Sequence, residues 1–168
     1  MAAVITVGLI LATAAVTLAA GTRAASITIQ GTVQPVNEIT ITPETGYNSL
    51  DLTATNAVTD TAVATVNEKN NCATGYTVTL VSLNAEGGQA RLKGSNRATQ
   101  YINYSMKYGP AGSEAAVTLD SKTGTVTSTA AASAEAGNNK RLLVTAAGNH
   151  GREAGVYSDT LVLTIAAK

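Results

Sequence analysis

The sequence has no phenylalanine and no tryptophan, and only one cysteine and three prolines among its 168 residues. A core without the two largest apolar side chains has to be filled by Val, Ile, Leu and Ala. With abundant Thr and Val, that composition favours a regular β architecture with a thin core. The single cysteine, Cys72, excludes an internal disulfide, so stability has to come from strand pairing and packing. We expect a buried, inert thiol there rather than an intermolecular disulfide.

The chain also lacks an excess of charge and any cluster of catalytic residue types. It carries 11 basic and 11 acidic residues, which favours neither nucleic acid nor an anionic membrane as a partner. The one histidine, His150, lies in a predicted loop without a partner that would make it a base or a ligand. No His/Cys cluster has zinc spacing, and no glycine-rich loop has the pattern of a phosphate site. The sequence therefore predicts no enzyme, no cofactor and no metal site.

The first residues differ sharply from the rest, because residues 4–20 are almost entirely apolar and small residues with Arg23 follow them. This pattern is typical of a secretory signal, although its usual positively charged start is missing. We expect residues 1–24 to be the signal, with cleavage after Ala24 and Gly21 as the alternative site. A transmembrane anchor is the rival interpretation, because the run is close to spanning length. After cleavage no stable membrane insertion is expected.

What the remaining chain does contain is strand-like alternation, recurring about every ten residues between turn signals. Residues 130–136 have helix propensity but are too few for a stable helix. A small strand is also expected around Val117 and Leu119. The main predicted strands cover residues 37–42, 61–67, 76–83, 90–93, 100–108, 125–127, 142–145 and 156–166. This pattern indicates one all-β domain, residues 36–168, built as an antiparallel β-sandwich.

Residues 25–35 form a further alternating stretch that has almost no partner nearby in the sequence. Ile27, Ile29 and Val33 share one face with Gly31, and the opposite face is polar. Pro35 marks a hinge to the next strand, since proline does not sit inside a paired central strand. The stretch is either the first strand of the chain's own sandwich or a strand that completes a sheet in another molecule.

Three segments together resemble the subunits of chaperone–usher pili, in particular the archaic branch that includes spore-coat-protein-U-like domains. The most specific is the end, residues 155–165, which is similar to a Gly-x-Tyr-x-Asp-Thr closing strand followed by alternating aliphatic residues. Residues 63–66 and 72–80 resemble the strand–Cys–turn–Tyr-Thr-Val pattern of the middle of these subunits. The leader followed by the alternating N-terminal stretch is the third. The cysteine pair and the aromatic residue near the C-terminus that many such subunits carry are absent.

The resemblance implies an incomplete immunoglobulin-like antiparallel β-sandwich that is completed by a donor strand from a neighbouring subunit. The donor strand would be residues 25–35, with Ile27, Ile29 and Val33 filling pockets and Gly31 permitting close approach. The acceptor groove would be lined by the closing strand. Its residues would be Leu161, Leu163 and Ile165.

The function expected from the resemblance is structural. The chain would be a subunit of a surface pilus or fimbria, a head-to-tail homopolymer that serves adhesion or biofilm formation. Its partners would be a periplasmic chaperone, an outer-membrane usher and further copies of itself, and it would be exported through the periplasm. A monomeric secreted β-sandwich that binds a sugar or a protein is the alternative.

Overall fold

The computed structural model describes residues 24–53, 58–96, 99–128, 136–148 and 152–168. The chain forms two compact units, Met1–Gln34 and Pro35–Lys168. In the described part of the first unit, residues 24–34, there is neither helix nor strand. The side chains of Ile27, Ile29 and Val33 there are 77%, 85% and 85% exposed. The expected signal lies outside the described residues except for Ala24.

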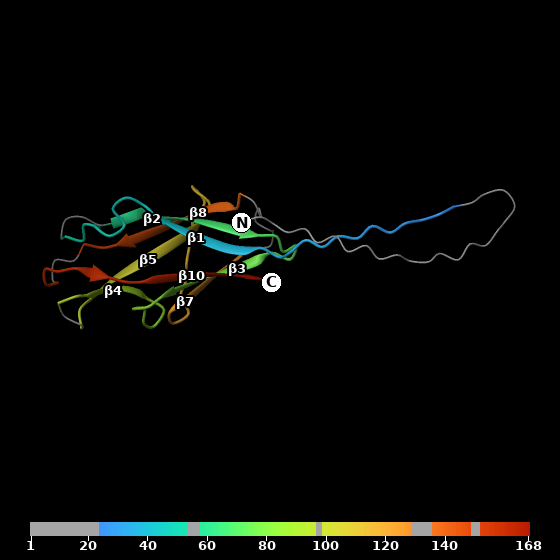
Figure 1. Cartoon of the computed structure of the whole chain (residues 1–168). Coiled ribbons are helices and arrows are strands. Elements are labelled where there is room, and N and C mark those ends of the chain that lie inside the picture. Colours follow the sequence, from blue (N-terminus) through green and yellow to red (C-terminus); the bar gives the residue numbers. More distant parts are fainter. Residues whose placement is uncertain (1–23, 54–57, 97–98, 129–135, 149–151) are drawn as a thin grey trace. The chain divides into compact units, whose positions relative to one another are not determined.

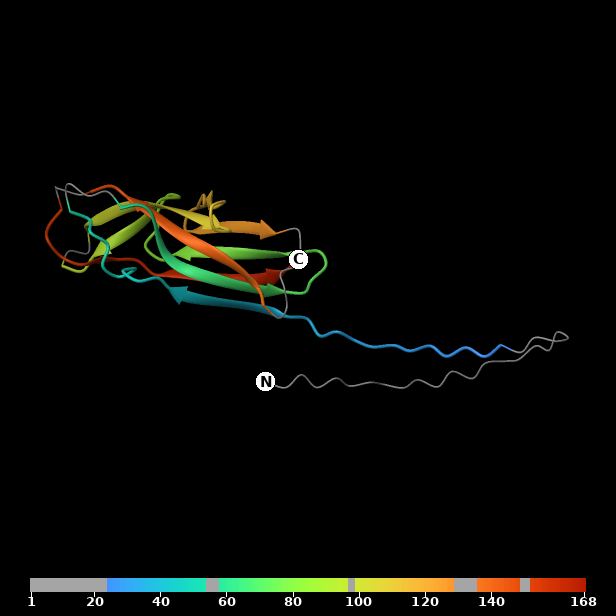
Figure 2. The same ribbon diagram turned by 90° about the horizontal axis from the view of Figure 1, so that it is seen from above.

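The second unit consists of two antiparallel sheets, labelled in Figure 1 and seen from above in Figure 2. Sheet A is ordered β1 (Asn37–Pro43), β2 (Val58–Asn70), β8 (Asn138–Ala146), β5 (Tyr101–Gly109), β4 (Ala90–Gly94) and β9 (Tyr157–Ser158), with β6 (Ala115–Ala116) paired to β5. Sheet B is ordered β10 (Leu161–Ala167), β3 (Tyr76–Ser82) and β7 (Thr123–Ser128). The described residues contain no helix, so the all-β prediction is confirmed.

The core lies between the sheets and is built from strict alternation. Along β3 every second residue is buried, from Tyr76 to Ser82, as the sequence pattern predicts. The core is not purely aliphatic, because Tyr76, Tyr104, Tyr108 and Met106 are also buried. Tyrosine therefore supplies the bulk that the missing phenylalanine and tryptophan would provide. Each buried hydroxyl consequently needs a hydrogen-bond partner.

Two strand predictions are wrong. The small strand expected at Val117 and Leu119 is instead Ala115–Ala116, and Leu119 is buried in the loop that follows. The closing strand expected over residues 156–166 is two strands in different sheets, since β9 pairs with β4 and β10 pairs with β3. The remaining main strands are present, most of them longer at one or both ends than the pattern indicates.

Asp159 explains why the closing strand divides. Its carboxylate accepts hydrogen bonds from the Tyr104 hydroxyl (2.7 Å), the Ser82 hydroxyl (2.5 Å), and the amides of Asn84 (3.0 Å) and Thr160 (2.8 Å). Burial, together with the neighbouring carboxylate, raises the pKa of Tyr104 well above its usual range. The carboxylate thus holds the chain where it leaves sheet A for sheet B.

Replacement of Asp159 by alanine should lower the free energy of unfolding by about 2–4 kcal/mol, because buried hydroxyl and amide donors lose a charged acceptor. Asp159→Asn keeps the shape and one acceptor oxygen, and should cost roughly half as much. Urea unfolding followed by tyrosine fluorescence measures both. Equal stability of Asp159→Ala and the unchanged chain would show that the crossover does not depend on this carboxylate.

Candidate functional site

Two strand edges face each other on one side of the sandwich. Within the described parts of the chain, β1 pairs only with β2, and β10 pairs only with β3. Both views place β1 beside β10 (Figures 1 and 2), and Cα atoms of the two strands approach within 8 Å. We call the line along which these two edges face each other the β1–β10 groove.

The groove is apolar on its inner side. Leu163 is 8% exposed, and Leu161 and Ile165 are partly buried against the core. From β1, Ile39 also packs against the core, while Ile41 remains 42% exposed. The structure thus places the three residues predicted for an acceptor groove on the core side of one edge strand. Ile39 and Ile41 of the opposite edge were not among the predicted site residues.

The backbone of β10 offers hydrogen-bonding groups along the same edge. The Leu83 amide donates to the Thr160 carbonyl (3.1 Å), and the Lys168 amide donates to the Gly75 carbonyl (3.2 Å). These two bonds set the alternation of the antiparallel ladder, in which every second residue bonds to its partner strand. The odd-numbered residues of β10 therefore direct their amides and carbonyls away from β3. They include Leu161, Leu163 and Ile165.

The same alternation applies to β1. The Asn71 amide donates to the Val36 carbonyl (3.4 Å), and the Glu44 amide donates to the Val63 carbonyl (3.0 Å). The residues whose backbone groups point away from β2 are therefore the odd-numbered ones. They include Asn37, Ile39 and Ile41. On both edges, the residues with inward apolar side chains are thus also the residues with outward backbone groups.

The distance between the two edges determines whether a strand can enter the groove. A strand that lies between two neighbours separates them by about 9.5 Å, twice the usual strand spacing. Parts of β1 and β10 are closer than this, since some of their Cα atoms lie within 8 Å. The two edges therefore have to move apart for a strand to enter along their whole length.

The predicted donor residues lie in the other compact unit. No described strand pairs with residues 24–34, and Ile27, Ile29 and Val33 are exposed. A Cβ atom built on Gly31 would meet nothing within 4 Å. The role of these residues as a donor strand stays a prediction, as does the acceptor role of the closing strand.

Cys72 differs from its prediction. It lies in the turn between β2 and β3 and is half-buried rather than buried. Its Sγ lies 3.0 Å from the Thr74 hydroxyl and 3.6 Å from the Lys168 carbonyl oxygen. The hydrogen bond with Thr74 lowers the pKa of the thiol. The expectation that the thiol is buried is therefore wrong, while its inertness stays a prediction.

Sequence reasoning also missed a buried carboxylate beneath β1. Glu68 is 2% exposed and lies opposite Ile39 in the β1–β2 ladder. It accepts hydrogen bonds from the hydroxyls of Tyr76 (2.5 Å) and Tyr108. Its place in the β2 alternation, in phase with Val66, is the signal that could have indicated burial.

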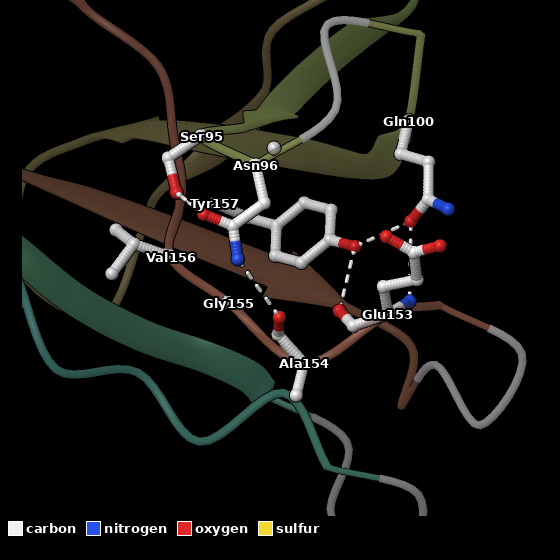
Figure 3. A pocket seen from close by; sticks show the side chains of 9 residues that line it. Ser95, Asn96, Gln100, Glu153, Ala154, Gly155, Val156 and Tyr157 are labelled. Atoms are coloured by element: carbon white, nitrogen blue, oxygen red, sulfur yellow. Dashed lines mark hydrogen bonds between the residues drawn. The ribbon is translucent and has the colours of Figure 1, made fainter.

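A small hollow lies at the loops near β9, away from the groove residues just described (Figure 3). Its empty space, open solvent included, is about 160 Å³. The Gln100 side-chain oxygen accepts hydrogen bonds from the Tyr157 hydroxyl (2.7 Å) and the Glu153 amide (3.2 Å), so these polar groups bond to one another. Ligand pockets are usually about 300–1,000 Å³. The hollow is therefore too small for an ordinary small-molecule site.

Across the described ranges, no group of three or more His, Cys, Asp or Glu side chains could hold a metal ion. The same part of the chain contains no helix long and apolar enough to cross a membrane. His150 lies outside the described residues.

Comparison with solved structures finds a similar fold. No family model and no curated protein matches the chain. A solved chain from a chaperone–tip adhesin complex, described as vital for synergistic activation of CFA/I fimbriae biogenesis, matches with a TM-score of 0.50 and 15% identity. The match covers 77% of this chain and 41% of that one, so this chain spans about two fifths of its length. The fold is thus an all-β, immunoglobulin-like antiparallel sandwich of the kind found in that complex.

The buried carboxylate of Glu68 leads to a prediction about how stability depends on pH. Burial, and then the hydrogen bond and charge of Glu68, raise the pKa of Tyr76 from 10.0 to about 12. The folded chain therefore keeps a proton that the unfolded chain loses above about pH 10, and stability should fall as the pH rises towards 12. In Glu68→Gln the Tyr76 pKa should fall but stay above its ordinary value, because burial remains.

Titration of tyrosinate absorbance tests this, with Tyr76→Phe as the control that assigns the signal among the six tyrosines. An unchanged Tyr76 pKa in Glu68→Gln would contradict the assigned hydrogen bond.

Proposed function

We propose that the chain is a structural subunit of a surface fimbria and polymerises when residues 25–35 of one copy fill the β1–β10 groove of the next. The observation that carries the proposal is the pair of facing, unpaired edges, in which apolar side chains and free backbone groups belong to the same residues. Strand addition to such edges is a known mode of recognition, and chaperone–pilin complexes are one instance.

The N-terminal segment has the properties that such a groove selects. It contains no charged residue from Ala25 to Pro35, and its apolar residues alternate with Thr and Gln. Ile27, Ile29 and Val33 are left exposed in the isolated chain. Burial of these three side chains contributes several kcal/mol, at about 1.5–3 kcal/mol for each. The strand hydrogen bonds add to this, each with a modest net value.

Assembly of this kind needs the groove to be protected until the next copy arrives. Unpaired edges with apolar surface are an aggregation hazard. We therefore propose that a periplasmic chaperone occupies the groove first, and that an outer-membrane usher carries out the exchange at the cell surface. The predicted signal of residues 1–24 is consistent with this route. The resemblance of residues 63–66, 72–80 and 155–165 supports the archaic branch, and adhesion or biofilm formation as the role.

The alternative, a monomeric module that binds a sugar or a protein, has no observation in its favour. The hollow of about 160 Å³ near β9 is small, and its polar groups bond to one another. The outward backbone groups of the β1–β10 groove, by contrast, match the hydrogen bonding of an extended strand once the two edges have moved apart.

The proposal predicts a ladder of multimers on an unheated denaturing gel of assembled material, which collapses to monomer on boiling. Ile29→Asp should remove the ladder, because it would place a carboxylate in an apolar pocket. Gln30→Asp is the matched control, since the adjacent side chain faces the other way and assembly should continue.

Two results would sink the proposal. One is a single monomer band from material that still self-associates after removal of residues 25–35. The other is a normal ladder from Ile29→Asp, which would show that this residue does not enter the groove.

A further inference from the structure

We infer that the junction Gln34-Pro35-Val36 prevents the N-terminal segment of a chain from filling the groove of the same chain, so that the groove stays available for a second copy. This inference rests on the proposed function. In the proposed assembly, the N-terminal segment of a chain competes with that of a second copy for the groove, because each chain carries both the donor segment and the groove. A tethered segment has an effective concentration on the order of millimolar, which would exceed that of any second copy.

Val36 is the fixed end of the junction. Its amide donates to the Asn71 side-chain oxygen (2.8 Å), and its carbonyl accepts from the Asn71 amide (3.4 Å). Both backbone groups of Val36 are therefore directed at the β2 side, where the β1–β2 ladder begins. To run back along the free edge of β1, the chain would have to reverse its direction within the residues just before this point.

A two-residue turn at Pro35 and Val36 would direct the apolar side chains of the N-terminal segment to the wrong face of the sheet. It would pair Gln34 with Asn37 and Thr32 with Ile39, and cross-strand partners share a face of the sheet. The polar residues would then point into the core, while Ile27, Ile29 and Val33 would point to solvent. The turn types that suit such hairpins also need a positive φ at their first residue, which proline cannot adopt.

A three-residue turn over Gln34, Pro35 and Val36 gives the correct face, because it would pair Val33 with Asn37 and Ile29 with Ile41. Its usual form is a type I turn followed by a residue in the left-handed region. Gln34 would need a helical conformation, which the following proline disfavours. Val36 would need a positive φ, which is a true outlier for a β-branched residue, and would lose its bonds to Asn71.

A longer turn would include residues of the N-terminal segment and so shorten the part that can pair with β1. A five-residue turn ending at Val36 would remove Val33 from pairing and leave only the part from Gly31 backwards. A strand from a second copy meets none of these constraints, because its junction is attached to a different sandwich. The junction therefore acts against a closed monomer and in favour of a chain of copies.

The test is to replace junction residues so that a three-residue turn becomes possible. The double variant Pro35→Asp with Val36→Gly permits a three-residue turn with glycine in the left-handed position. We expect it to fold as a monomer and to lose the multimer ladder. Pro35→Asp alone keeps Val36, and Val36→Gly alone keeps Pro35, so both single variants should still assemble.

A second variant, with Gly-Ser-Gly-Gly inserted between Gln34 and Pro35, leaves Val36 and its bonds unchanged and allows any register. It should also give a folded monomer, and it decides the question if circular dichroism shows the double variant to be unfolded. An undiminished ladder from the insertion variant would overturn the inference. Absence of the ladder in the unchanged chain would instead contradict the proposed function.

Discussion

The proposed assembly depends on one constraint, which is that the outward backbone groups of β1 and β10 have no partner strand within the described chain. Each strand pairs on one side only within the described chain, and neither edge is covered by another described strand. With one cysteine, no disulfide ties the two sheets together. A strand inserted in the groove would join sheet A to sheet B through main-chain hydrogen bonds. Such a strand is the basis of the proposed assembly.

The composition of the core follows from what the chain lacks. Because phenylalanine and tryptophan are absent, tyrosine provides the large side chains, and each buried hydroxyl is matched by a carboxylate. Glu68 accepts from Tyr76 and Tyr108, and Asp159 accepts from Tyr104. Buried carboxylates are costly unless they are hydrogen-bonded, so these pairs specify one arrangement of the sheets. Asp159 also separates β9 from β10, so that β10 pairs with β3 at the edge of sheet B.

Much of the fold could be predicted from the sequence, because alternation reports directly on which face of a strand is buried. It located β3 and β5 and placed Leu161, Leu163 and Ile165 on the core side. It left the break at Asp159 unrecognised, although this charged residue interrupts the apolar phase of Tyr157, Leu161 and Leu163. The crossover itself is revealed by the contacts of the carboxylate. Nor could alternation show that Cys72 is only half-buried. The outward backbone groups of β1 and β10 depend on strand register, which a single sequence does not contain.

The central claim is that a strand fills the β1–β10 groove in the assembled protein, and backbone hydrogen exchange tests it most directly. The amides of Leu161, Leu163, Ile165, Ile39 and Ile41 point away from their only partner strands in the single chain. They should exchange slowly in the assembled material and rapidly in the free, folded subunit. The amides of Val162 and Thr164, which face β3, serve as the internal reference. Equally rapid exchange of the outward amides in both states would contradict the account.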